Sequence, residues 1–147
     1  MPSHPSTAIE QTVEFTVPYL VPPSGNHYKE PCRYMGKGGY LRLGYRITAE
    51  AKAYYDAVAI FAQGRTVSPE DNKERKRVRY GVQMNVYLGP NMHGDFDNFW
   101  KCGLDALVRS GVIHSDARVS GKHSNSIVHK DQRDNPRTHY TVTRLED

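Results

Sequence analysis

The sequence has few cysteines and no long apolar segment. Its two cysteines, Cys32 and Cys102, belong to no CxxC pair, which excludes a zinc ribbon or a thioredoxin-type motif and makes a disulfide framework unexpected, so that a reducing cytoplasm is favoured. No apolar run approaches the ~20 residues that a membrane-spanning helix needs. The N-terminal residues lack the cationic start and apolar stretch of a signal peptide. We therefore expect a cytoplasmic protein with no membrane partner.

The composition is polar and basic but that of a folded chain. A length of 147 residues fits one domain of ordinary size. Lys and Arg number 20 against 16 acidic residues, which gives a net charge of +4 and a pI near 9.1. Such a charge favours a polyanionic partner, although a basic protein with no nucleic-acid role has the same composition.

The apolar periodicity predicts an α+β domain over residues 12–147, preceded by a loose tail over residues 1–11. The pattern favours a small mixed sheet with two main helices packed on one face. Residues 29–46, rich in glycine and basic side chains, are expected to form a flexible loop, with a short strand possible near 40–47. Strands are expected at 12–17, 80–88, 119–129 and 138–145, one helix between the cap Thr48 and Gly64, and another at 97–109 with Gly111 as its stop.

The residues that indicate chemistry gather around the start of the second predicted helix. Asp95 and Asp97 flank Phe96 in an extended segment, which sends both carboxylates to one side. Asp97, Lys101 and Asp105 then follow at helical spacing and share one stripe. Two carboxylates this close repel each other, and a bound divalent cation relieves that repulsion. Mg²⁺ prefers such oxygen ligands, and metal ions held by carboxylates hydrolyse phosphodiesters with help from a nearby lysine.

Each of these residues also has a simpler interpretation. Asp97 can cap the helix, Asp95 and Asp116 are common turn residues, and Lys101 can form an ordinary surface ion pair with Asp97 or Asp105. Asp105 is favoured as a structural or pairing residue. A transition-metal site formed by His93 and His114 with Asp95 is a further alternative, but its spacing matches no zinc pattern.

In order and spacing these residues resemble the motif of RusA-type Holliday junction resolvases. That motif has an Asp-x-Asp-Asn pair, a later Lys, an Asp-Ala-Leu, a Gly-Val and a third Asp. The resemblance extends over about residues 13–145, and it departs from the family where His114-Ser115 replace a frequent acid and where the loop 29–44 is longer than usual. The matching residues are Asp95, Asp97-Asn98, Lys101, Asp105-Ala106-Leu107, Gly111-Val112 and Asp116, with Pro22-Pro23-Ser24-Gly25-Asn26 upstream.

The resemblance implies a crossover junction endodeoxyribonuclease of DNA recombination and repair, bacterial or phage-encoded. It implies a homodimer that binds four-way DNA junctions and makes paired symmetric nicks. It also implies that Asp95, Asp97 and Asp116 bind Mg²⁺, with Mn²⁺ as a substitute, and that Lys101 assists catalysis. A two-fold dimer suits the approximate two-fold symmetry of a junction.

Two basic groups are the predicted DNA contacts, because phosphate contacts give affinity without base specificity. A solvated loop that keeps the protein soluble is the alternative for both. Competing functions are a nuclease for other branched DNA, a non-catalytic DNA-binding module of the same fold and, less consistent with the basic charge, a metal-dependent transferase. The first basic group is Lys73, Arg75, Lys76, Arg77 and Arg79, and the second is Arg118, Lys122, His123, His129 and Lys130.

Overall fold

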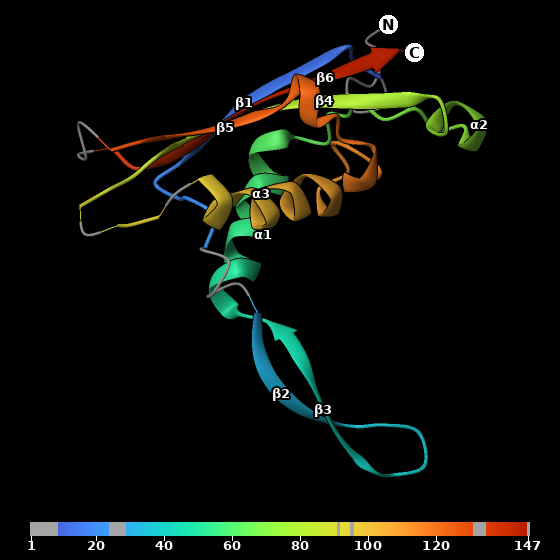
Figure 1. Ribbon diagram of the computed structural model, residues 1–147, viewed down its shortest axis with the longest axis vertical. Helices are drawn as coiled ribbons and strands as arrows, with labels where there is room; N and C mark the ends of the chain where they lie inside the picture. Colours follow the sequence, from blue (N-terminus) through green and yellow to red (C-terminus); the bar gives the residue numbers. More distant parts are fainter. Residues whose placement is uncertain (1–8, 24–28, 91, 95, 131–134, 147) are drawn as a thin grey trace, which may run out of the picture.

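A four-stranded sheet, two helices beneath it and a projecting hairpin make up the molecule (Figure 1). The computed structural model describes residues 9–23, 29–90, 92–94, 96–130 and 135–146, and of residues 96–98 the backbone alone. Over these residues the elements are β1 (Thr12–Pro18), β2 (Lys29–Met35), β3 (Leu41–Ile47), α1 (Ala49–Ala62), α2 (Asn72–Arg75), β4 (Val78–Tyr87), α3 (Phe96–Arg109), the 3₁₀ turns η2 (Asp116–Arg118) and η3 (Gly121–His123), β5 (Asn125–His129) and β6 (Arg137–Glu146). The predicted α+β class is confirmed.

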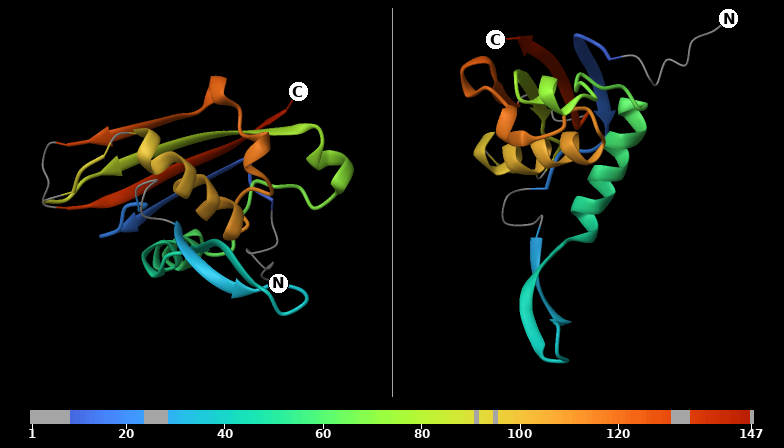
Figure 2. Two further views of the ribbon diagram at one scale, coloured as in Figure 1. Left: turned by 60° about the horizontal axis from the view of Figure 1, so that its bottom comes forward. Right: turned by 90° about the vertical axis from the view of Figure 1, so that its right-hand side faces the viewer.

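The main sheet has the strand order β1-β6-β4-β5. β6 pairs antiparallel with both β1 and β4, whereas β4 pairs parallel with β5, so the sheet is mixed as predicted. A parallel pair needs a long crossover connection, and α3 lies in it. Both α1 and α3 cover the same face of the sheet (Figures 1 and 2). Alternate strand residues point into the core on that face, among them Val13, Phe15, Val82, Met84, Val86, Tyr140 and Val142.

The helix boundaries follow the predicted signals. The Thr48 side chain accepts a hydrogen bond of 3.1 Å from the amide of Ala51 and caps α1. Gln63 and Gly64 end that helix in the left-handed region. At the end of α3, Gly111 has φ 82°, and the amide of Val112 returns to the carbonyl of Leu107 at 3.0 Å. The predicted stops at Gly64 and Gly111 are confirmed.

Helix α3 lies very close to the sheet because Gly103 faces it. A Cβ at Gly103 would collide with the Met84 sulfur. Beside this contact, the buried hydroxyl groups of Tyr54 and Tyr140 are 2.6 Å apart, and the Tyr140 hydroxyl also donates to the Gly103 carbonyl. These contacts tie α1, α3 and β6 together and fix the helix that carries the candidate site.

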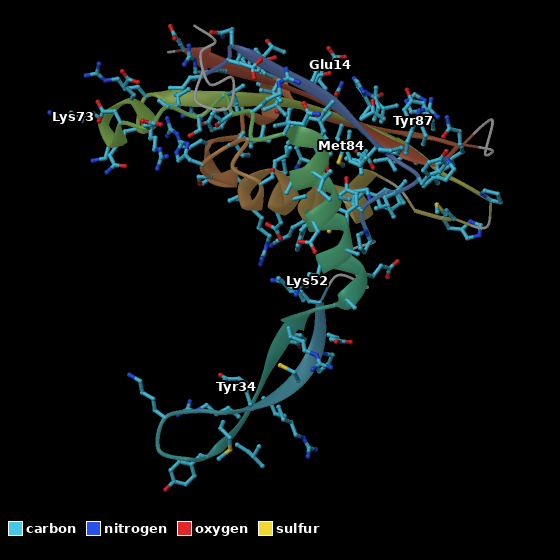
Figure 3. The ribbon with its side chains drawn as sticks, turned by 180° about the vertical axis from the view of Figure 1, so that it is seen from behind. Glu14, Tyr34, Lys52, Lys73, Met84 and Tyr87 are labelled. Atoms are coloured by element: carbon cyan, nitrogen blue, oxygen red, sulfur yellow. The ribbon has the colours of Figure 1, made fainter. Side chains whose placement is uncertain are left out.

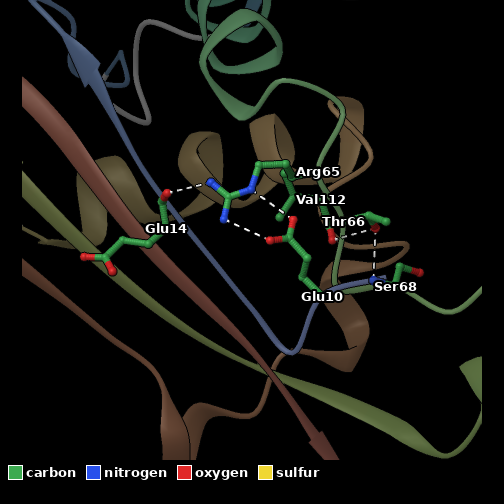
Figure 4. A network of polar contacts seen from close by, with 6 residues as sticks. All are labelled: Glu10, Glu14, Arg65, Thr66, Ser68 and Val112. Atoms are coloured by element: carbon green, nitrogen blue, oxygen red, sulfur yellow. Dashed lines mark hydrogen bonds and ion pairs between the residues drawn. The ribbon is translucent and has the colours of Figure 1, made fainter. Parts of the chain in front are cut away.

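Residues 9–11, the last of the predicted tail, contact the body. The amide of Glu10 donates to the carbonyl of Thr66, and its carboxylate pairs with the Arg65 guanidinium at 2.9 Å. Arg65 also donates to the carbonyl of Glu14 in β1 (Figure 4). Residues 1–8 lie outside the described part of the chain.

Three segments differ from the sequence-based expectation. Residues 29–46 belong to a regular hairpin instead of a flexible loop, because Gly36, Gly38 and Gly39 supply its turn, the latter two with φ 86° and 77°. The short strand expected near 40–47 is confirmed as β3. The strand predicted at 119–129 is confined to β5, because residues 121–123 form the 3₁₀ turn η3 instead. The amide of His123 donates to the carbonyl of Ser120 at 3.1 Å, and the Ser120 hydroxyl lies 2.9 Å from the His123 Nδ1. The short helix α2 was also not predicted.

Candidate functional site

The predicted Asp-x-Asp pair lies at the start of α3. Asp95 lies outside the described residues, and Asp97 belongs to the first turn of α3, where only the backbone is described. Just before them, Gly94 has φ 149°, and a Cβ there would come within 2.6 Å of the Phe99 ring. Phe99 is itself buried in the core. Only glycine fits this corner without strain, so the core fixes the point at which the chain enters the site helix.

Lys101 and Asp105 follow Asp97 on one side of α3. Lys101 is exposed and Asp105 half-buried, whereas Cys102, Leu104, Ala106 and Leu107 face the core. Lys101 and Asp105, two residues of the predicted stripe, therefore lie on the outward side of the helix. At 1.5 Å rise per residue, the backbones of Asp97 and Asp105 are about 12 Å apart along the axis, with Lys101 midway.

The structure brings Asp116 to this helix. Asp116 is exposed in η2, and η2 contacts α3. Its carboxylate is near enough to Asp105 to affect that side chain. Burial raises the pKa of the Asp105 carboxyl, and the charge of Asp116 raises it further. The cations of Lys29, Lys101 and Arg109 oppose this rise.

The structure adds Asp105 and Lys29 to the residues near the candidate site. The helical spacing places Asp105 on one stripe with Lys101, and the interpretation of Asp105 as a structural or pairing residue stays a prediction. The charge of Asp116 acts on its carboxylate. Lys29 comes from the base of the β2–β3 hairpin, and nothing in the sequence places it near α3.

The donors near η2 and α3 are carboxylate oxygens, which suit Mg²⁺. Within the described residues, no three His, Cys, Asp or Glu side chains converge as a metal site does, and the Asp95 and Asp97 side chains lie outside that set. Asp105 is half-buried and Asp116 is exposed, and a divalent cation near both would relieve the repulsion between their like charges. The donor chemistry therefore fits the predicted ion.

His114 does not support the alternative transition-metal site. Its Nδ1 lies 2.5 Å from the Tyr80 hydroxyl, and the two rings meet edge to face. Burial lowers the pKa of His114, and Arg75 and Arg118 lower it further. This histidine therefore already has a partner within the fold.

Most of the predicted DNA contacts lie at the end of the sheet that carries α2. Lys73 and Arg75 are in α2, Lys76 and Arg77 follow it, Arg79 is the second residue of β4, Arg118 is in η2, and Lys122 and His123 are in η3. His129 and Lys130 lie at the opposite end of β4, because His129 pairs with Tyr87, the last residue of that strand. Two of these cations serve the fold. Arg75 donates to the Pro69 carbonyl at 2.7 Å, and Arg118 donates to the carbonyls of Val78 and Lys76 at 2.9 and 2.8 Å. The second bond of Arg118 connects the two predicted groups at this end of the sheet.

Comparisons with known proteins identify no family for this chain. The chain matches no protein-family model, and a search of curated proteins found no significant match. The resemblance to RusA-type resolvases therefore rests on the ordered motif residues. Among the described residues, no helix has the length and apolar character to cross a membrane.

Proposed function

We propose that the chain is a Mg²⁺-dependent endodeoxyribonuclease that cuts branched DNA, with the four-way junction as its substrate. One observation carries this proposal. Asp116, which is distant in sequence from Asp97, is in a turn that contacts the helix bearing Asp97, Lys101 and Asp105, and its charge acts on Asp105. Acids from two separate parts of the resolvase-like motif thus belong to one corner of the fold, which supports a shared site.

Asp97 and Asp116, with Asp95, would hold the metal ion. The ion would supply an activated water and neutralise charge on the scissile phosphate. Lys101 is exposed on the same side of the helix and can donate to a phosphate oxygen as negative charge develops. Asp105, one turn further on, is a positioning residue that orients Lys101 and shares the acidic field.

A homodimer would place two such sites about the two-fold axis of a junction. Each site would cut one of two equivalent strands, which gives the paired symmetric nicks that resolution requires. Contacts within one chain already fix the position of α3, so dimer formation would have to align two preformed sites.

The deciding experiment compares cleavage of a synthetic four-way junction with cleavage of linear duplex, in Mg²⁺ and in EDTA. We expect Mg²⁺-dependent, symmetric cuts in the junction alone. Asp97→Asn and Asp116→Asn should each lower the cleavage rate at least about 10²-fold, because a metal ligand is lost, while junction binding is kept. Asp56→Asn, at an exposed position on α1, is the matched control.

Three results would overturn parts of the proposal. Undiminished cutting by both ligand variants would remove the site. Equal cutting of both substrates would remove the junction specificity. Binding of the junction without cleavage in Mg²⁺ or Mn²⁺ would identify a non-catalytic DNA-binding module.

A further inference from the structure

The β2–β3 hairpin projects away from the rest of the molecule (Figures 1 and 2). β2 and β3 pair with each other over seven residues each and with no strand of the main sheet. Of residues 29–47, only Ile47 at the base packs against the hydrophobic core. The hairpin is therefore an arm that neither the main sheet nor the hydrophobic core covers within the described residues.

One face of the arm is largely apolar. Residues opposite each other in an antiparallel pair lie on the same face, so the register groups Pro31, Arg33 and Met35 of β2 with Tyr45, Leu43 and Leu41 of β3. Leu43 is 81% exposed and Tyr45 76%. An apolar surface kept this open in the described chain needs a partner.

The opposite face is closed by its own contacts. Arg46 pairs with Glu30 at 2.8 Å, and the Tyr34 ring covers Gly44, where a Cβ would come within 2.8 Å of it. The side chain of Arg42 likewise lies over Gly36. The arm thus holds its own shape and leaves the apolar face and the tip for binding.

The arm also carries the net charge of the protein. Residues 29–47 contain five Lys or Arg and one Glu, a net charge of +4, which equals that of the whole chain. The other 128 residues are balanced, with 15 basic and 15 acidic side chains. The arm therefore combines positive charge, exposed aliphatic side chains and three tyrosines, Tyr34, Tyr40 and Tyr45.

A second copy of the arm fits this surface poorly. Each strand is about 23 Å long and the ribbon about 10 Å wide, so one face offers roughly 230 Å² in outline. A standard protein interface needs about 800 Å² from each partner. Two arms packed together would also bring like charges of +4 into contact.

We infer that the arm binds DNA at a branch point and gives the protein its preference for branched over linear DNA. The cations would contact phosphates, the tyrosines would stack on exposed bases, and Leu or Met side chains would wedge at base steps. Stacking requires bases that are free of a continuous duplex stack, as they are at a branch, and a wedge costs less there because the stack is already interrupted. The positive charge of Lys29, at the base of the arm, is close enough to Asp105 to oppose the rise of its pKa. DNA bound along the arm would therefore pass close to the candidate site. The choice of DNA as the polyanion rests on the proposed function.

Two arm variants and one comparison variant test this inference by binding, in EDTA so that cleavage plays no part. The first arm variant, Arg33→Gln/Lys37→Gln/Arg42→Gln, removes three exposed cations. It should weaken binding to junction and duplex about 10- to 100-fold and lower the salt slope by about 2 to 3. The comparison variant, Lys73→Gln/Lys76→Gln/Arg77→Gln, removes the same charge among the predicted DNA contacts at α2, at the other end of the molecule from Tyr34 (Figure 3), and should weaken junction and duplex binding by the same factor, because phosphate contacts read no branch or base.

The second arm variant, Tyr40→Ala/Leu43→Ala, keeps the charge. It should weaken junction binding about tenfold and leave duplex binding within twofold, because only branched DNA exposes bases to these side chains. All positions changed in the arm are exposed, so the thermal unfolding midpoint should stay unchanged in both arm variants.

The outcomes separate this inference from the proposed function. Loss of binding by the arm variants supports the inference even if the wild-type chain cuts no DNA. Wild-type binding by both arm variants would overturn it. It would also be overturned if Tyr40→Ala/Leu43→Ala turned a dimer into a monomer without changing DNA binding, since the arm would then be a contact between copies.

Discussion

The main sheet and the β2–β3 arm both contain antiparallel strand pairs, but the main sheet buries one of its faces and the arm leaves its apolar face exposed. In the main sheet, alternate side chains such as Val82 and Val142 are fully buried beneath α1 and α3. In the β2–β3 arm, Leu41 and Leu43 alternate in the same way and stay 70% and 81% exposed. An isolated two-stranded hairpin is at best marginally stable in water. The main sheet therefore carries the stability of the protein, and the arm is free to carry binding.

This difference explains where substitutions should act. Core positions contribute through burial of apolar area and through close packing. Most arm side chains bury little area, so folding constrains their identity weakly, apart from the turn glycines and the close contacts over Gly36 and Gly44. Exposed apolar side chains and unbalanced charge in the arm are therefore better explained by a partner than by the fold.

The largest expected difference between the arm and the core is in the reactivity of their two cysteines, because Cys32 is in the arm and Cys102 in the core. Cys32 is partly exposed on β2, whereas Cys102 is fully buried. Burial raises the pKa of the Cys102 thiol from 9.0 to about 12. We expect Cys32 to react with a thiol reagent such as DTNB at pH 8 at least about 10³-fold faster than Cys102, since Cys102 reacts only when the body opens.

The Cys32→Ser variant is the control and should show the slow reaction alone. In denaturant, both thiols should react at similar rates. Rapid reaction of both thiols in the native protein would mean that the body opens as readily as the arm, and the comparison would fail.

Two leucine substitutions give the next largest contrast. Leu107 in α3 is fully buried and Leu43 in the arm is exposed. Leu107→Ala should lower the free energy of unfolding by about 2–5 kcal/mol, through lost transfer energy and a cavity. Leu43→Ala should change it by less than about 0.5 kcal/mol. Urea unfolding followed by circular dichroism measures both, and an equal loss would show that the arm packs on the body in solution.

The difference between the buried main sheet and the exposed arm also explains which strands the sequence could predict. The unbroken alternation from Tyr80 to Leu88 predicted β4, because burial of one face demands that period. Leu41, Leu43 and Tyr45 alternate equally well and agree with the short strand expected near 40–47, whereas the glycines of 29–46 favoured a flexible loop for the rest of the segment. No local signal tells that the apolar side of this strand faces solvent. Alternation predicts a strand, whereas the path of the whole chain decides whether the strand is covered.

Some contacts of the candidate site could be predicted from the sequence and others could not. The helical spacing of Asp97, Lys101 and Asp105 is enough to predict that they share one side of α3. The approach of Asp116 to Asp105 depends on how η2 returns along α3 after the Gly111 turn, and that of Lys29 on where the arm begins. Such contacts join distant segments, and spacing within one sequence cannot predict them.

A polar pair from each region gives a smaller contrast. The hydroxyls of Tyr54 and Tyr140 share a buried hydrogen bond of 2.6 Å, whereas the Glu30–Arg46 pair in the arm is largely exposed. Tyr140→Phe should lower the free energy of unfolding by about 1–3 kcal/mol, because the Tyr54 hydroxyl loses a partner in the core. Glu30→Gln should change it by less than about 1 kcal/mol. A larger effect of Glu30→Gln, measured in the same urea titration, would mean that the arm depends on its ion pair.

The smallest predicted effect lies where the two regions meet, at Asp105. Its pKa is raised above the ordinary value of 3.8 by burial and by Asp116, despite Lys29 at the base of the arm. Between the ordinary and the raised pKa, the folded protein binds a proton more tightly than the unfolded chain does. The contribution of Asp105 to stability therefore falls as pH rises through that window, and the penalty persists at neutral pH.

Asp105→Asn should accordingly stabilise the protein at pH 7, by less than about 1 kcal/mol because the carboxylate is partly solvated. The gain should shrink as pH is lowered toward 3.8, and Asp56→Asn should show none. Mg²⁺ should stabilise the wild-type protein more than the variant, since an ion bound to the folded state alone favours that state. Stabilisation by Asp105→Asn would mean that the protein keeps this acid at a cost to stability, which a metal site or a substrate would explain. Destabilisation at pH 7 would instead mark Asp105 as a pairing residue that the fold needs.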